Sequence, residues 1–185
     1  MSDKEIISLI RNGQHEEAFN GLVKSYSERL YWHVRRFVCS HEDTDDLLQE
    51  IFIKVWTALP SFRGDSQVYT WLYRIATNES LNHLNRMRVR QALKFESLTT
   101  ELTDRTDSDP YFSGDDAQRA LSKAILKLPA KQKTVFIMRY CEDMSYEDIS
   151  EILDTSVGAL KASYHFSKEK IVLELKKDPG VIKPE

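Results

Sequence analysis

The sequence has only two cysteines, Cys39 and Cys141, and they lie far apart. Neither belongs to a CxxC pair, and neither has a pair of histidines nearby at the spacing of metal ligands. A thiolate metal site or a dithiol redox site would need such clustering. We therefore expect the two cysteines to be small residues on helix faces.

Glycine, proline and long apolar runs are scarce as well. The 185 residues include six glycines and five prolines, and almost no stretch alternates apolar with polar side chains as a half-buried strand would. No apolar run is long enough to span a membrane, and the polar N-terminus has no signal peptide. These absences predict an all-α, cytoplasmic protein.

The charge is arranged in blocks, which the net charge of -3 hides. There is no acidic residue between Glu79 and Glu96, whereas residues 96–116 contain seven acidic residues and one arginine. This acidic span is rich in Ser and Thr and shows no apolar period, which is typical of a flexible linker. We therefore predict two small helical domains, at residues 1–94 and 117–178, joined by a flexible acidic linker at 95–116 and followed by a tail at 179–185.

Within both domains, apolar residues recur at steps of three and four, and turn residues separate these stretches. The expected helices of the first domain cover residues 2–11, 16–38, 45–59 and 69–94. Those of the second domain cover residues 117–128, 131–140, 145–153 and 157–175. Ser2 and Ser145 each begin a capping pattern and are expected to cap the helices that follow them.

The stretch at residues 45–56 has two different faces when it is read as a helix. Its apolar face, a wide stripe that must be buried, consists of Leu47, Ile51 and Val55 with Leu48, Phe52 and Trp56 beside them. Its polar face carries Asp45, Asp46, Gln49, Glu50 and Lys54. A compact acidic face of this kind is suited to docking on a basic partner.

The acidic cluster formed by Asp43, Asp45, Asp46 and Glu50 allows a rival interpretation as a divalent-metal site, because Asp46 and Glu50 are one turn apart and could share an ion. No matching histidine or distant carboxylate motif accompanies them, however, and acids are also favoured at a helix N-terminus by its dipole. No nucleophile elbow, P-loop or HExxH pattern is present either. We therefore expect no metal, no cofactor and no enzymatic activity.

Residues 62–94 combine aromatic and basic side chains. Asn78, Asn82, Arg86 and Arg90 are four residues apart and therefore share one helix face, where Asn can read adenine edges and Arg can bind guanine or phosphate. Just before them lie four aromatic residues on which unpaired bases could stack, namely Phe62, Tyr69, Trp71 and Tyr73. The alternative is that the rings belong to the core, which we expect for Tyr69 and Tyr73, as for Leu72 and Ile75.

The last two expected helices fit a helix-turn-helix, in which a three-residue turn precedes a helix that begins with small residues. Ser156, Gly158 and Ala159 would allow a close approach to DNA. The side chains that could reach phosphates or base edges are Lys161, Ser163, Tyr164, His165 and Lys168. The alternative is an ordinary helical hairpin.

Three blocks, in this order, resemble the extracytoplasmic-function (ECF) sigma factors of bacterial RNA polymerase, which belong to the sigma-70 family. The first block is DDLLQE at 45–50 with KVW at 54–56, and the second is FRGDS at 62–66 with YTWLYRIATN at 69–78. The third is LP at 128–129, SYEDI at 145–149 and SVGALK at 156–161. The resemblance covers nearly the whole chain.

The resemblance implies a role for each surface. Core polymerase, through the clamp of its β′ subunit, would be bound by Asp45, Asp46, Gln49, Glu50 and Lys54, and the β flap is a further expected contact. The −10 element of promoter DNA would be melted and read by Phe62, Arg63, Ser66, Trp71, Asn78, Asn82, Arg86 and Arg90. The −35 element would be read by Ser156, Val157, Gly158, Ala159, Lys161, Tyr164, His165 and Lys168. No small-molecule substrate is implied.

Two further expectations come from the family. The acidic linker would pass near the active-site and RNA-exit channels of the polymerase. The protein would be held inactive by an anti-sigma factor, which in this family is often membrane-bound.

The chain departs from the family in its last two helices. Ser163 and Phe166 stand where many relatives have arginine, and Asp154 stands in the turn where glycine is usual. We expect Asp154 to adopt a positive φ, which Asp tolerates better than most residues. The rival function is a free-standing helix-turn-helix regulator that binds operator DNA, which would leave the acidic helix and the aromatic loop without a role.

Overall fold

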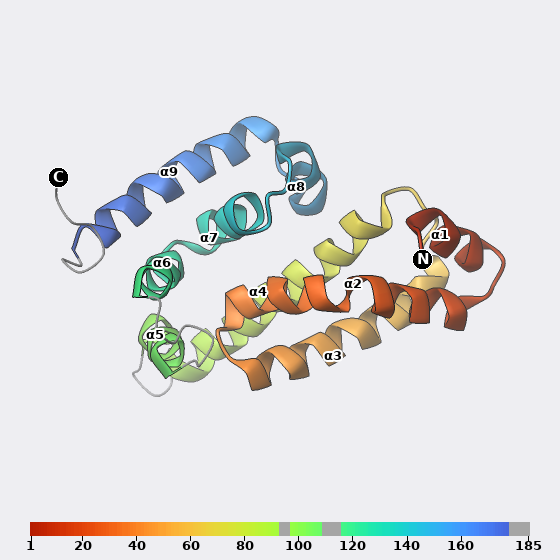
Figure 1. Cartoon of the computed structure of the whole chain (residues 1–185), viewed down its shortest axis with the longest axis horizontal. Coiled ribbons are helices and arrows are strands. Elements are labelled where there is room, and N and C mark those ends of the chain that lie inside the picture. The colour runs from red at the N-terminus through yellow and green to blue at the C-terminus, as the bar shows by residue number, and fades with distance from the viewer. Residues whose placement is uncertain (93–96, 109–115, 178–185) are drawn as a thin grey trace.

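The computed structural model describes residues 1–92, 97–108 and 116–177, and these residues contain helices and turns but no strand. The prediction of an all-α protein is confirmed. Helices α1–α4 form one group and α6–α9 form another, with α5 beside the ends of both groups (Figure 1). In the described part of the chain, no helix is both long and apolar enough to cross a membrane.

The first domain is built on three long helices and a short one. These are α1 (Asp3–Arg11), α2 (His15–Val38), α3 (His41–Ala58) and α4 (Val68–Ala92). Their shared core contains fully buried side chains from each of them, including Ile6, Leu22, Leu30, Leu47, Ile51 and Leu72. The predicted capping box at Ser2 is present, with the Glu5 carboxylate 2.6 Å from the Ser2 backbone nitrogen.

Helix α3 differs from its prediction at both ends. It begins at His41, four residues earlier than expected, because the Ser40 hydroxyl accepts a hydrogen bond from the Asp43 backbone N–H at 3.2 Å and caps the helix. A short 3-10 helix, η1 (Leu59–Ser61), follows its last turn. The predicted burial of the whole apolar stripe was wrong for Trp56, which is 45% exposed and has its ring packed edge-on against Phe19.

The predicted linker contains a helix, α5 (Leu98–Ser108). Leu102 is 1% exposed and Thr106 is fully buried, and Arg105 forms ion pairs with Glu101 and with Asp43 of α3. The prediction of a linker without regular structure was therefore wrong for these residues. The remainder of the linker, at 95–96 and 109–115, lies outside the described residues.

The second domain contains α6 (Asp116–Leu126), α7 (Ala130–Phe136), a π-helical segment η3 (Ile137–Cys141), α8 (Tyr146–Leu153) and α9 (Val157–Leu175). The single helix expected at 131–140 is thus an α-helix followed by a π-helical turn. Asp154 ends α8 with φ 48°, as predicted, and Ser145 and Ser156 cap α8 and α9. Helices α8 and α9 therefore form the expected helix-turn-helix.

The two domains contact each other through α8, which packs on α4. Thr70 of α4 donates a hydrogen bond to the Glu151 carboxylate at 3.4 Å, and the Arg74 guanidinium donates to the Glu151 carbonyl oxygen. The helix-turn-helix is thereby docked on the helix that carries the aromatic and basic residues.

Candidate nucleic-acid interface

The polar face of α3 lies at the surface, and some of its side chains form ion pairs whereas others do not. Asp46 and Gln49 are exposed and form no ion pair within the described residues, and Glu50 lies 3.4 Å from the Arg86 guanidinium. Asp45 is half-buried, 3.5 Å from the imidazole of His41. Of the four acids considered as metal ligands, Glu50 and Asp43 therefore pair with different arginines, since Asp43 pairs with Arg105.

Lys54 is exposed, as expected for the polar face of α3, and it also pairs with a residue of α4. Its Nζ lies 2.6 Å from the carboxylate of Glu79 on α4. An apolar side chain that was not predicted to belong to this face extends it, because Ile53 is 65% exposed. Ile53 follows Gln49 by four residues, so its spacing from the polar row was the available signal.

The loop before α4 provides a pair of aromatic rings. The ring centroids of Phe62 and Trp71 are 4.8 Å apart, and both side chains are half-buried. Gly64 takes a φ of 80°, a conformation that side-chain-bearing residues rarely adopt. Arg63 is exposed and Ser66 is half-buried. The loop therefore leaves part of this aromatic pair accessible beside a guanidinium group.

The other aromatic residues of this segment belong to the core or pack on it. Tyr73 is 4% exposed, and burial raises the pKa of its hydroxyl to about 12. Burial also raises the pKa of Tyr69, which is half-buried with its ring centroid 4.5 Å from that of Tyr73. Leu72 is fully buried and Ile75 is partly buried, so the core alternative is confirmed for this group.

The basic face of α4 is continuous. Asn78, Asn82, Arg86 and Arg90 are all exposed, as their spacing predicts. Near the C-terminal end of α4, residues of α3, α4 and α5 line a polar cavity of about 240 Å³, among them Asp43, His83, Arg86, Arg90, Glu101 and Arg105. Burial lowers the pKa of His83. Its neutral form is therefore favoured inside this cavity, beside the arginines.

The exposed side of α9 carries the other predicted DNA contacts. Gly158, Ala159, Lys161, His165 and Lys168 are exposed, and a Cβ at Gly158 would meet nothing within 4 Å. Val157 is half-buried, and the capping residue Ser156 accepts from the Ala159 backbone N–H at 3.4 Å.

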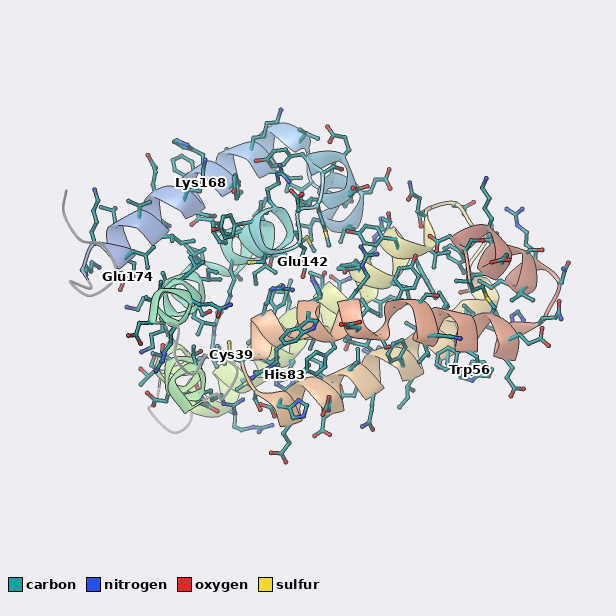
Figure 2. All side chains as sticks on the ribbon, viewed as in Figure 1. Cys39, Trp56, His83, Glu142, Lys168 and Glu174 are labelled. Atoms are coloured by element: carbon teal, nitrogen blue, oxygen red, sulfur yellow. The ribbon has the colours of Figure 1, made fainter. Side chains whose placement is uncertain are left out.

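Tyr164 is less accessible than its neighbours on α9. Its ring stacks on Phe136 with centroids 5.8 Å apart, and burial raises the pKa of its hydroxyl. Lys168 on α9 lies well apart from Trp56 at the end of α3 (Figure 2). The basic end of the second domain and the apolar end of the α3 face are thus separate surfaces.

Comparison with known proteins matches both domains. The family described as sigma-70 region 2 matches residues 22–90, and that described as sigma-70 region 4 matches residues 118–171. The ECF RNA polymerase sigma-E factor of Haemophilus influenzae is 32% identical over 179 residues, which cover 92% of this chain and 94% of that protein. Neither matched family segment includes α5.

Two solved structures share the fold. The structure of CnrH in complex with the cytosolic domain of CnrY has a TM-score of 0.68 at 22% identity, covering 95% of this chain and 98% of that one. The sigma factor RpoE from Bartonella quintana, in complex with the anti-sigma factor NepR, has a TM-score of 0.65 at 21% identity, covering 86% of this chain and 98% of that one.

Proposed function

The chain belongs to the ECF sigma factors of the sigma-70 family, and we propose that three separate surfaces divide its work between them. As a sigma factor, it binds core RNA polymerase and directs it to promoters. In the proposed division, the polymerase clamp is bound by four residues of the polar face of α3, namely Asp45, Asp46, Gln49 and Glu50, whereas Lys54 pairs with α4. The aromatic loop and the exposed face of α4 melt and read the −10 element, and α9 reads the −35 element.

The observation that carries this division is the exposed row on α4. Asn78, Asn82, Arg86 and Arg90 remain at the surface while the neighbouring Leu84 and Met87 are buried. Since amide and guanidinium groups bind base edges and phosphates, this row fits a duplex edge. The half-exposed Phe62–Trp71 pair lies near the start of the same helix, where unpaired bases could stack.

The docking role of α3 is supported by its exposed carboxylates. The ion pair between Glu50 and Arg86 joins two side chains that are each more than half exposed. Such surface pairs contribute little free energy, so Glu50 is available for exchange with a basic partner. The polar face would then contact the polymerase without disturbing the buried residues behind it.

A sigma factor of this family can also be bound by an inhibitory partner protein. The solved relative from Bartonella quintana is bound to an anti-sigma factor, and we propose that a protein of this kind also restrains this chain. The site of action is the cytoplasm, where polymerase and promoters meet. A free-standing regulator is not favoured, because the region 2 match covers residues 22–90, which such a regulator would not need.

The experiment is transcription in vitro with purified core polymerase. The double substitution Asp46→Lys and Glu50→Lys should abolish co-purification with core polymerase and promoter-dependent transcription, while helical content is unchanged. The matched control is Glu28→Lys with Glu147→Lys, which makes the same charge change at exposed positions on α2 and α8. If the first variant still co-purifies, or if both variants fail alike, α3 is not the docking surface.

A further inference from the structure

Glu79 of α4 is a buried carboxylate between the proposed polymerase-binding surface and the proposed −10 surface. The residue is 6% exposed. Its Oε2 lies 2.6 Å from Nζ of Lys54 on α3. Its Oε1 accepts a hydrogen bond from Nδ2 of Asn82, one turn further along α4, at 3.4 Å.

Burying a carboxylate is costly unless it is paired and hydrogen-bonded. Here Oε2 of Glu79 is within ion-pair distance of Lys54, although it has no hydrogen-bond partner among the described residues, and Oε1 accepts a hydrogen bond from Asn82. Both partners are exposed residues. Lys54 supplies the positive charge, and Asn82 supplies the N–H donor. The arrangement therefore fixes two side chains that would otherwise be free to rotate in solvent.

The contact with Glu79 determines which end of the Asn82 amide faces the carboxylate. A carboxylate accepts hydrogen bonds but donates none, so it favours the NH₂ end of the Asn82 amide and repels the carbonyl end. One amide orientation is thus selected, which leaves Oδ1 and the second N–H of Asn82 for other partners. An Asn side chain that reads a base edge uses one acceptor and one donor, and their order decides which edge fits.

We propose that Glu79 is a positioning residue for promoter recognition, which sets the amide orientation of Asn82 and hence the base that Asn82 prefers. The proposal rests on the proposed function of the exposed α4 face. It also gives Lys54 an internal role: this lysine neutralises Glu79 instead of contacting the polymerase.

The test measures initiation by the holoenzyme on a promoter library randomised across the −10 element. Glu79→Gln keeps the size of the side chain and can offer Asn82 either an acceptor or a donor, so the amide orientation is no longer selected. This variant should reduce discrimination on the order of ten-fold at the single position that Asn82→Ala also relaxes. In the Asn82→Ala background, Glu79→Gln should cause no further change in base preference.

Other results would overturn the proposal. A purely structural role for Glu79 would lower initiation uniformly across the library and leave every base preference intact. A change in preference that persists without Asn82 would mean that Glu79 acts by another route. If instead Asn82→Ala alters no base preference, the proposed reading role of Asn82 fails, independently of Glu79. Circular dichroism and thermal unfolding establish that each variant is folded.

The role of Lys54 is tested by affinity for core polymerase and by unfolding. Lys54→Met should leave core affinity within about two-fold and should destabilise the protein, because it strands a buried carboxylate. Combining it with Glu79→Gln should restore part of the lost stability, since no buried charge then remains. If Lys54→Met weakens core binding equally with and without Glu79→Gln, the lysine contacts the polymerase and its assigned internal role is wrong.

Discussion

His33 of α2 and Glu142, which follows η3, join the two domains: the imidazole Nδ1 lies 2.9 Å from the Glu142 carboxylate. The other ring nitrogen lies 3.0 Å from the Thr77 hydroxyl, which itself donates to the Tyr73 carbonyl oxygen at 2.6 Å. The fully buried His33 therefore contacts α4 with one ring nitrogen and the segment after η3 with the other.

The first prediction is that Glu142→Ala loosens the docking of the second domain. The substitution strands the buried His33 and also removes the partner of Arg36, whose Nη1 lies 3.3 Å from the carboxylate. The free energy of unfolding should fall by about 1–3 kcal/mol, the cost of leaving a buried polar group without its hydrogen-bond partner, and backbone amides of α8 should exchange hydrogen faster. Glu147→Ala, at an exposed position of α8, is the control. Equal exchange in the two variants would show that Glu142 does not hold the domains together.

The second prediction uses the reactivity of Cys141, which lines a cavity of about 250 Å³ between α2, α6 and η3. Burial raises the pKa of its thiol from 9.0 to about 11. Because the thiolate is the nucleophile, alkylation at pH 8.5 should be on the order of a hundred-fold slower in the folded than in the unfolded protein. A Cys39→Ser background isolates this thiol.

The raised pKa of Cys141 also fixes the direction of a stability change. The pKa of the Cys141 thiol is higher in the folded than in the unfolded protein. Its contribution to the free energy of unfolding is therefore fully present below pH 9.0 and is lost as the pH rises through about 11. Urea unfolding with and without Cys141→Ala measures it. A thiol that reacts at the unfolded rate in native buffer would contradict the burial of this side chain.

The third prediction concerns Ile53, on the same face of α3 as Gln49 and Glu50. Because it is 65% exposed, Ile53→Ser should change the free energy of unfolding by less than about 0.5 kcal/mol. Affinity for core polymerase should nevertheless fall about ten-fold, as for an apolar anchor within a polar interface. Val89→Ser, at a 64% exposed position on α4, should leave core affinity unchanged. A similar loss in both variants would argue against a specific anchor.

The fourth prediction concerns the turn of the helix-turn-helix. Asp154 has φ 48°, a conformation that costs glycine nothing. Asp154→Gly should therefore be neutral or stabilising by up to about 1 kcal/mol, and Asp154→Val should destabilise by about 1–2 kcal/mol. Thermal unfolding compares the two variants. If Asp154→Gly were instead strongly destabilising, the carboxylate of Asp154 would have a hydrogen-bonding role in this turn.

The fifth prediction separates the two DNA surfaces. In the holoenzyme, Arg86→Ala should reduce open-complex formation, and a template with a pre-melted −10 bubble should restore part of the activity. Lys161→Ala should weaken the initial binding that depends on the −35 element, which a bubble should not restore. Permanganate footprints on linear and bubble templates measure both effects. Identical responses on both templates would contradict the division of labour between α4 and α9.

Much of the candidate site could be predicted because its determinants are local. The caps at Ser2 and Ser145 bond to groups three residues away, and the positive φ of Asp154 was indicated by the glycine that relatives usually have at this turn. The faces of α3, α4 and α9 follow from a 3.6-residue period, so most of their exposed polar residues were identified correctly.

The tertiary structure decided what depends on partners distant in sequence. Lys54 pairs with Glu79, which lies on another helix, and Trp56 remains 45% exposed with its ring packed edge-on against Phe19 of α2. Helix α5 was missed because an acidic span has little apolar period, and only packing buries Leu102. Contacts between side chains on different helices depend on how all the helices pack together. The local spacing of residues in the sequence does not determine that packing.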